Sequence, residues 1–293
     1  MVIVIVGPTG VGKTKLSIEL AKKYNGEVIN ADSTQVYREM DIATAKVTVE
    51  EMDGVVHHLL DIRNMDEDYS VYDFQNDCRN CINDIISRGK TPIIAGGTGL
   101  YVKAALYDYK FDLESSNFDY SSYSNDKLYE RLLSIDPDSS IHKNNRKRIE
   151  RALSYYDSTG GILSEKEKTD KLLYDCVFIG LTTDRNVLYD RINKRVDIMV
   201  SNGLLDEAKR IYDSGVRSKA VMTPIGYKEL FSYFSGDCGF DEAISLIKQR
   251  SRNYAKRQYT WFNNQMNINW FDVDFNNFLN TVNEICNFID SRN

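Results

Sequence analysis

Short apolar runs alternate with amphipathic segments along the first half of the chain. The first run, residues 2–6, is β-branched and ends at a glycine, which is typical of a fully buried strand in a parallel sheet. Strands are predicted over residues 2–6, 27–30, 92–95 and 176–181, and helices over 13–24 and 73–88. Strands that alternate with helices indicate βαβ units and a doubly wound α/β sheet.

The pattern changes in the middle of the chain. Ser, Asn, Asp and Tyr dominate residues 115–125, and two helical stretches follow around 128–133 and 146–156. We therefore expect a small, mainly helical insertion over 112–172 within a core formed by 1–111 and 173–293. From Arg185 onward the pattern predicts helices almost throughout.

A phosphate-binding loop follows the first strand. Residues 7–14 fit GxxxxGK[ST] between a buried strand and a helix, so the sheet is expected to be P-loop NTPase-like. Glycines let consecutive backbone N–H groups turn around an anion, and the helix N-terminus adds a favourable dipole. We expect Lys13 to bind the terminal phosphate and the Thr14 hydroxyl to bind Mg²⁺. The expected diphosphate-binding residues are Gly7, Pro8, Thr9, Gly10, Val11, Gly12, Lys13 and Thr14.

Two polar residues follow other predicted strands. Ligands of open parallel sheets bind beyond the carboxyl ends of the strands, and both Asp32 and Thr98 are expected there. An aspartate beside a bound phosphate can accept a proton from an attacking nucleophile. The alternative is that Asp32 only caps a helix that begins after it.

Composition excludes several classes of protein. The longest apolar run near the start, residues 1–6, is too short for a membrane span and lacks the flanks of a signal peptide. Five cysteines without such a signal favour a reducing compartment, and we expect a cytoplasmic protein. Cys78 and Cys81 share an apolar helical face, which favours packing over metal or redox chemistry. His57 and His58 have no third ligand at metal-site spacing, so we expect no zinc site.

The motifs together resemble the tRNA dimethylallyltransferase family over almost the whole chain and in the same order. Besides the phosphate loop, the similarity lies in residues 32–37 (DSTQVY), 40–46, 57–61, 96–101 (GGTGLY), 148–153, 159–160, 191–195, 224–229 (PIGYKE) and 255–261 (AKRQYTW). The chain departs from the family pattern at Ala43, Val47, Ser154, Gly161 and Asn263, none of which is an expected catalytic position.

The resemblance implies transfer of a dimethylallyl group to the exocyclic N6 of the adenosine 3′ of the anticodon in certain tRNAs. The loop would then bind the diphosphate of dimethylallyl diphosphate and not ATP. Because an adenine amine is a poor nucleophile, a base must take its proton, and Asp32 fits that role, assisted by Thr98. Lys13, Arg195 and an Mg²⁺ ion on Thr14 would stabilise the departing diphosphate.

Basic residues form three groups in a chain whose net charge is −6. Arg191 and Arg195 share one helical face, and residues 143–151 and 248–257 are strongly basic. Each group is also compatible with an ordinary solvated surface, but two basic helices in an acidic protein favour a phosphate backbone as partner. Gln35 is expected to read the adenine edge. The residues expected to contact the anticodon stem-loop are Ser33, Thr34, Gln35, Lys147, Arg148, Arg151, Gly226, Tyr227, Lys228, Arg252, Lys256, Arg257 and Gln258.

Three other functions remain open on the residues alone. A P-loop metabolite kinase would bind ATP in the same loop and use Asp32 on a substrate hydroxyl. Prenyl transfer to free AMP or ATP would not need the insertion. A GTPase-like switch is the least favoured, because no guanine-specific signature is present. We expect a monomer without membrane association.

Overall fold

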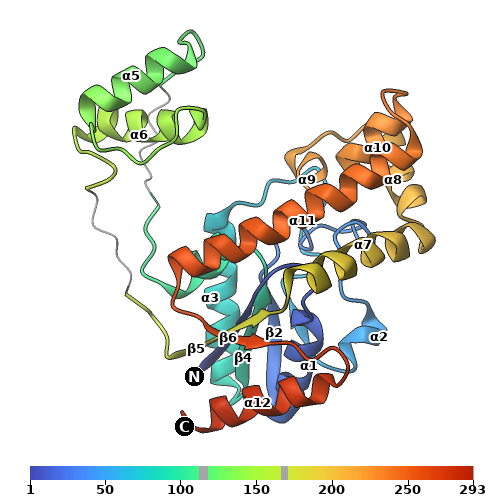
Figure 1. Cartoon of the computed structure of the whole chain (residues 1–293). Helices are drawn as coiled ribbons and strands as arrows, with labels where there is room; N and C mark the ends of the chain where they lie inside the picture. Colours follow the sequence, from blue (N-terminus) through green and yellow to red (C-terminus); the bar gives the residue numbers. More distant parts are fainter. Residues whose placement is uncertain (112–117, 166–170, 293) are drawn as a thin grey trace. The chain divides into compact units, whose positions relative to one another are not determined.

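The chain divides into two units, each of which is described by itself. The computed structural model describes residues 1–111, 118–165 and 171–292 (Figure 1). One unit, here called the core, comprises Met1–Tyr107 and Leu172–Asn293, and the other, the insertion, comprises Asp108–Lys171. The boundary expected at residue 112 lies outside the described residues.

A parallel sheet forms the centre of the core and confirms the predicted α/β class. Its order is β3-β2-β4-β1-β5-β6, and every pairing of neighbouring strands is parallel. The strands are β1 (Val2–Val6), β2 (Gly26–Asn30), β3 (His57–His58), β4 (Thr91–Gly96), β5 (Cys176–Thr182) and β6 (Asn269–Asp272). The β-branched run of β1 is buried at every position, as expected for a central strand.

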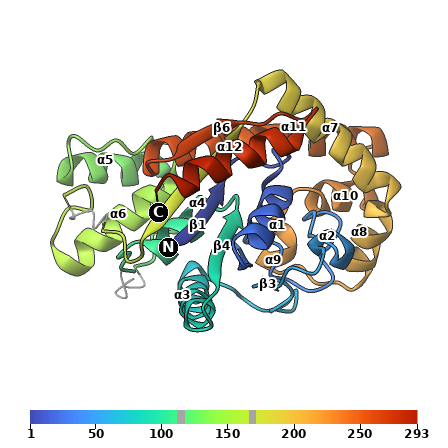
Figure 2. The ribbon, with the colours of Figure 1, turned by 90° about the horizontal axis from the view of Figure 1, so that it is seen from below.

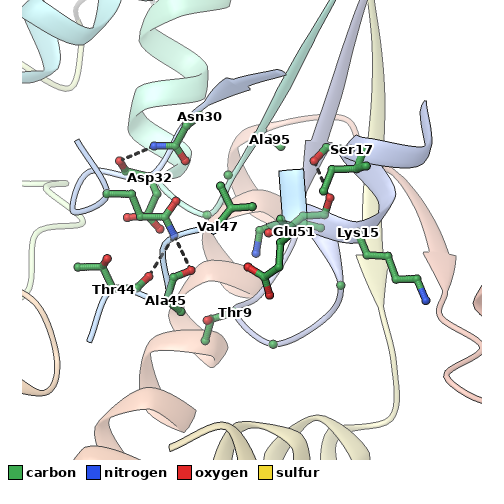
Figure 3. Close-up of a pocket in the computed structure, with 18 of the residues that line it drawn as sticks. Thr9, Lys15, Ser17, Asn30, Asp32, Thr44, Ala45, Val47, Glu51 and Ala95 are labelled. Carbon is green, nitrogen blue, oxygen red and sulfur yellow. Dashed lines mark hydrogen bonds between the residues drawn. The ribbon is translucent and has the colours of Figure 1, made fainter. Parts of the chain in front are cut away.

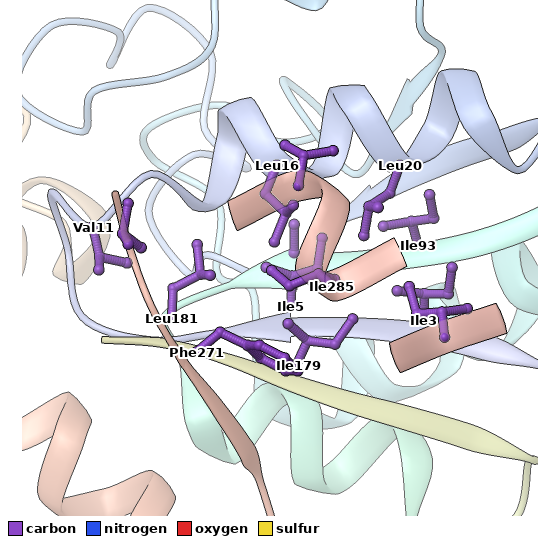
Figure 4. Close-up of a cluster of buried hydrophobic side chains, with 14 of the residues drawn as sticks. Ile3, Ile5, Val11, Leu16, Leu20, Ile93, Ile179, Leu181, Phe271 and Ile285 are labelled. Atoms are coloured by element: carbon purple, nitrogen blue, oxygen red, sulfur yellow. The ribbon is translucent and has the colours of Figure 1, made fainter. Parts of the chain in front are cut away.

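Helices cover both faces of the sheet (Figure 2). On one face α1 (Lys13–Lys23) and α12 (Phe278–Asp290) pack on alternate residues of the strands. Figure 4 shows that cluster, in which Leu16 and Ile285 lie over Ile5. On the other face α3 (Val71–Ser87) and α4 (Gly99–Leu106) bury Phe74, Ile82 and their neighbours. The sheet is therefore apolar on both sides, and polar groups gather at the ends of its strands.

A group of helices extends the core beyond the carboxyl ends of the strands (Figure 1). It has its own apolar cluster, which includes Leu204, Tyr227 and Ile247. The helices are α7 (Arg185–Ser201), α8 (Leu204–Asp213), α9 (Lys219–Met222), α10 (Tyr227–Phe234) and the long α11 (Phe240–Gln265), with α2 (Val49–Met52) nearer the sheet. Because α11 also packs on α4, it joins this group to the sheet.

The insertion contains two helices that pack on each other. They are α5 (Asn125–Ile135) and α6 (Arg146–Thr159), and their shared apolar cluster includes Leu128, Leu132, Ile149 and Leu153. Both helices were predicted from the helical spacing of these side chains.

Two edge strands were missed by the sequence prediction. Strand β3 has only two residues, which is too short for any periodic signal. Strand β6 lies in the part of the chain where helices were expected almost throughout, and no strand was predicted there. At β6, Trp270 and Phe271 pack on opposite faces of the sheet. An edge strand among asparagines offers too few alternating positions to be recognised.

A buried carboxylate joins the amino end of β2 to the segments around it. Glu27 is 2% exposed and accepts hydrogen bonds from Arg88 at 2.6 and 2.7 Å and from Lys90 at 2.7 Å. His58 Nε2 lies 2.7 Å from the same carboxylate. These partners, Arg88 foremost, hold the pKa of Glu27 well below its usual range.

We expect Glu27→Gln to lower the free energy of unfolding by about 1–3 kcal/mol at pH 7, less than for a fully buried pair because Arg88 and Lys90 are about a third exposed. A carboxylate with a depressed folded pKa stabilises the protein above its unfolded pKa and loses that effect in acid. In urea unfolding, the difference in the free energy of unfolding between the wild type and Glu27→Gln should be constant above about pH 5 and should decrease below it. Equal stability at pH 7 would contradict this account of Glu27.

Candidate active site

A cavity of about 730 Å³ lies at the carboxyl ends of β1, β2 and β4 (Figure 3). Each strand leads into one part of its wall: the phosphate-binding loop after β1, Asp32 after β2, and Gly97 after β4. Helices α7 and α11 supply Arg195 and Tyr254. The cavity thus lies where an open parallel sheet is expected to bind its ligand.

Residues 9, 10 and 12–14 of the phosphate-binding loop form the floor of the cavity, whereas Val11 packs in the apolar core and is not among the lining residues. Gly7 has a φ of 142°, and a Cβ there would lie 2.7 Å from the carbonyl oxygen of Leu181, so only glycine fits without a shift. The Lys13 ammonium donates to the carbonyl oxygens of Gly7 at 3.0 Å and Pro8 at 2.8 Å. The lysine is therefore folded over the loop it belongs to.

The charge of Lys13 is held in a dry environment. Burial lowers the pKa of Lys13 to about 8, which Asp32 opposes by attraction and Arg195 promotes by repulsion. Burial likewise lowers the pKa of the Arg195 guanidinium, and Asp32 opposes that shift too. Two desolvated cations beside one carboxylate make this region suited to an anion.

Asp32 lies at the wall of the cavity and is fixed by a tight turn. Its Oδ1 accepts a hydrogen bond from the Thr34 backbone N–H at 2.9 Å and from the Thr34 hydroxyl at 2.7 Å. Residues 31–40 form turns and no helix, so the alternative that Asp32 caps a helix is wrong. Because both bonds use Oδ1, the second oxygen, Oδ2, lies outside the turn and suits a base.

Thr98 contacts the segment that carries Asp32. Its Oγ1 accepts from the Ser33 N–H at 3.1 Å and donates to the Ser33 hydroxyl at 3.4 Å. Thr98 therefore lies beside the turn that carries Asp32, but only Asp32 is among the residues that line the cavity. Tyr254 of α11, which the sequence analysis did not single out, lines the cavity. Burial and the charge of Asp32 raise the pKa of Tyr254 to about 12, so its hydroxyl keeps its proton.

Both arginines of α7 contact the phosphate-binding loop. Arg195 donates to the Thr9 hydroxyl at 3.3 Å and approaches the Ala45 carbonyl oxygen at 3.5 Å, the outer limit of a hydrogen bond. Arg191 donates to the Gly10 carbonyl oxygen at 3.2 Å, and its guanidinium lies 3.7 Å from the centre of the Phe275 ring. Arg195 is therefore not part of a merely solvated face, whereas Arg191 contacts the loop but remains exposed.

Gln258 has a different position from the one expected. It is 5% exposed, and its amide bridges two loops: Oε1 accepts from the Thr9 N–H at 2.8 Å, and Nε2 donates to the Gly97 carbonyl oxygen at 3.0 Å. A Cβ on Gly97 would lie 2.1 Å from that Nε2, so the close approach requires glycine. The prediction that Gln258 contacts tRNA is corrected: it connects α11 to the floor of the cavity.

Two further residues of the expected tRNA contact set are internal. Tyr227 is fully buried and donates to Glu207 Oε1 at 2.8 Å, and Gly226 is buried beside it, so neither offers a surface to tRNA. Lys228 is exposed. Gln35 lies at the cavity, where its Nε2 donates to the carbonyl oxygens of Thr44 at 3.0 Å and Ala45 at 3.2 Å. Ser33 and Thr34 are half-buried in the Asp32 turn.

The basic segment of α11, residues 248–257, offers fewer exposed cations than expected. Lys248 pairs with Asp197 at 2.5 Å, and Arg252 donates to Asn193 at 2.6 Å, so both turn toward α7. Lys256 and Arg257 are exposed. On the insertion, the side chains that were expected to contact tRNA are exposed on α6, namely Lys147, Arg148 and Arg151.

No set of protein side chains that would form a metal site is found among the described residues. No group of three or more His, Cys, Asp or Glu side chains in that part of the chain is placed to hold an ion. Instead, His57 contacts the Val55 carbonyl oxygen and His58 contacts Glu27. The Thr14 hydroxyl is exposed at the cavity, where it would hold a Mg²⁺ ion, a hard cation that prefers oxygen ligands. In the described ranges, no helix combines the length and apolarity needed to cross a membrane.

The fold and the cavity define a P-loop α/β protein with a cavity at the carboxyl ends of its strands. The model of a family described as IPP transferase matches residues 35–265. The chain is 51% identical over 300 residues to the tRNA dimethylallyltransferase of Anoxybacillus flavithermus, covering 99% of this chain and 96% of that protein. The chain belongs to the IPP transferase family, as its motifs predicted.

Solved structures agree with this assignment. The full-length tRNA isopentenylpyrophosphate transferase of Bacillus halodurans is similar with a TM-score of 0.77 and 48% identity, over 99% of this chain and 95% of that one. A eukaryotic dimethylallyltransferase acting on tRNA is similar with a TM-score of 0.86 and 34% identity, over 99% of this chain and 79% of that one.

The pKa of Lys13 predicts a pH dependence of anion binding. A bound diphosphate would favour the charged lysine and raise its pKa. The affinity for diphosphate should therefore be highest and nearly constant below about pH 8, and should fall by up to about tenfold per pH unit above it. We expect calorimetric titration with inorganic diphosphate to give this fall in the wild type. Lys13→Met should bind at least about tenfold more weakly at pH 7. The ligand's own ionisation affects both proteins equally, so parallel pH curves for the two would contradict the assignment.

Proposed function

We propose that this chain transfers the dimethylallyl group of dimethylallyl diphosphate to the exocyclic N6 of the adenosine 3′ of the anticodon in certain tRNAs. The observation that carries the proposal is the fixed Asp32 carboxylate beside the phosphate-binding loop and the buried cations Lys13 and Arg195, here together called the cradle. The names of its relatives, which are tRNA dimethylallyltransferases and tRNA isopentenylpyrophosphate transferases, support the same substrates.

In the proposed reaction Asp32 acts as the general base. The N6 lone pair is delocalised into the adenine ring, so the amine must lose a proton as it attacks. A bond forms between N6 and the allylic carbon, and the bond from that carbon to the diphosphate oxygen breaks. The N6 proton passes to Asp32 Oδ2, and the diphosphate leaves with the electron pair. The hydrogen bonds from Thr34 to Oδ1 hold the carboxylate in place.

The cradle stabilises the leaving group. Charge grows on the diphosphate as the carbon–oxygen bond breaks, and Lys13 and Arg195 lie where that charge would be. Backbone N–H groups of residues 10–14 and the N-terminus of α1 add partial positive charge. A Mg²⁺ ion on Thr14, when bound, would neutralise part of the same charge.

The target adenosine must leave its stack to reach a base inside a cavity. Because the Gln35 amide nitrogen already donates to Thr44 and Ala45, Gln35 would read the adenine through its Oε1. Phosphate contacts would come from the exposed cations of both units, namely Lys228, Lys256 and Arg257 in the core and Lys147, Arg148 and Arg151 in the insertion.

The expectation of a monomer stays a prediction. All five cysteines, which lie in the described ranges, are free thiols, and this supports a reducing, cytoplasmic setting. No relative or solved structure reported above supports the kinase alternative.

One assay tests the function and separates it from its alternatives. The protein is incubated with Mg²⁺, labelled dimethylallyl diphosphate and either unmodified tRNA or free AMP and ATP. We expect label on tRNA alone, at N6 of the adenosine next to the anticodon after nuclease digestion. Asp32→Asn should lower kcat by about 10²–10⁴-fold and leave tRNA affinity nearly unchanged. Label on free nucleotides, or near-normal turnover of the variant, would overturn the proposal.

A second prediction concerns the exposed cations of α11. Lys256→Ala with Arg257→Ala should raise the tRNA KM and flatten the plot of log affinity against log salt by about 1–2 units. Affinity for dimethylallyl diphosphate should stay the same, because the cradle is intact.

The matched control is Lys23→Ala with Arg292→Ala. It removes the same charge from two other sites. Lys23 ends α1 and pairs with Asp290 of α12, and Arg292 follows α12 and lies over the Phe288 ring. If both double variants change the salt slope equally, the effect is one of net charge, and the assignment of Lys256 and Arg257 to tRNA binding is wrong.

A further inference from the structure

A buried carboxylate of α8 organises a loop that forms one wall of the cavity. Glu207 is 8% exposed, and its Oε2 accepts hydrogen bonds from the backbone N–H groups of Asp41 at 2.9 Å and Ile42 at 2.8 Å. Its Oε1 accepts from the Ala43 N–H at 3.0 Å and from the Tyr227 hydroxyl at 2.8 Å. One carboxylate thus collects the N–H groups of three consecutive residues.

This arrangement is that of an anion held in a concave run of backbone N–H groups. Such runs usually bind phosphate or another external anion, but here the protein supplies the anion itself. A buried carboxylate is costly unless several donors compensate it, and the four donors to Glu207 are all neutral groups of the protein. The bonds therefore tie the two partners together, because Glu207 loses three of its four donors if the loop moves.

The loop needs such external support. Ala45 has a φ of 50°, a left-handed conformation that is uncommon for a residue with a side chain. On its far side the loop is held by Lys46, which is 5% exposed and donates to the Tyr37 carbonyl oxygen at 2.7 Å and to Asp41 at 2.6 Å. Glu207 and Lys46 therefore hold the segment from Asp41 to Lys46 from both ends.

The carbonyl oxygens of this segment face catalytic groups. Those of Thr44 and Ala45 accept the amide hydrogens of Gln35, and that of Ala45 lies 3.5 Å from an Arg195 nitrogen. In Figure 3 Thr44 and Ala45 lie at the cavity wall, with Asp32 and Thr9 nearby. A shift of the loop would displace the partners of Arg195 and Gln35 without changing either residue.

We propose that Glu207 is a positioning residue of this enzyme, which sets the place of Arg195 and Gln35 through the loop of residues 41–46. The signal was available in the sequence only as an acidic residue on an amphipathic helix, where a solvated surface is the ordinary expectation. Activity as a readout rests on the proposed function, so the wild type is measured first. If wild-type protein does not prenylate tRNA, the proposed function fails, and the loop is then judged by diphosphate binding alone.

The test compares Glu207→Gln with Glu27→Gln. In Glu207→Gln one end of the side chain becomes an N–H donor and faces a backbone N–H, so the loop should be released. We expect kcat/KM for dimethylallyl diphosphate to fall by about tenfold to a hundredfold. Affinity for inorganic diphosphate should weaken at least about threefold, and amide exchange at residues 41–43 should accelerate. Affinity for tRNA should stay within about twofold.

Glu27→Gln also removes a buried charge with several partners, but at the amino end of β2. It should lower stability and leave the kinetic constants unchanged well below the melting temperature, which separates positioning from loss of stability. If Glu207→Gln does not fold, Glu207→Asp replaces it in the test. Aspartate keeps the carboxylate charge on a side chain one methylene shorter, so kcat/KM should still fall at least about fivefold relative to the wild type. Wild-type kinetics and diphosphate affinity in a folded Glu207 variant would overturn the proposal.

Discussion

The site depends on two desolvated cations that face one carboxylate. Lys13 and Arg195 are both buried enough to lower their pKa values, and Asp32 opposes both shifts. The Lys13 ammonium donates to carbonyl oxygens of its own loop. In the proposed reaction a diphosphate would offer it full negative charges in a medium where electrostatic interactions are strong. In the proposed reaction Asp32, the carboxylate between these cations, would also accept the proton of the attacking amine.

Each of these charges is held by a segment from a different part of the chain. The turn of Asp32 is joined to β4 through Thr98 and Ser33. The floor of the cavity is joined to α11 through Gln258, and the loop near Arg195 is joined to α8 through Glu207. Preorganised groups of this kind need little rearrangement during the reaction, which is the condition for electrostatic stabilisation of a leaving group. The exposed cations of α11 lie on the helix that carries Gln258, so the surface and the cradle share one rigid element.

Local patterns predicted the centre of this structure and part of its site. The β-branched β1, the glycine-rich loop and Lys13 are adjacent in sequence, so their chemistry was readable together. Asp32 and Thr98 followed from the rule for strand ends. The roles of Gln258, Tyr227 and Glu207 depend on contacts between residues far apart in the chain, and their spacing on a helix indicated only which face they share. Gln258 and Tyr227 were expected at the surface as tRNA contacts, but both are buried in the structure. Edge strand β6 was missed because its alternation spans four residues.

The central claim is that the cradle is built for a prenyl diphosphate and not for a nucleoside triphosphate, although the loop motif allows both. Calorimetric titration of the wild-type protein with dimethylallyl diphosphate and with ATP, each with Mg²⁺ at pH 7, tests this claim directly. We predict that dimethylallyl diphosphate binds at least about tenfold more tightly than ATP, and that Lys13→Met weakens its binding. Tighter binding of ATP would contradict the account and would return the chain to the kinase alternative.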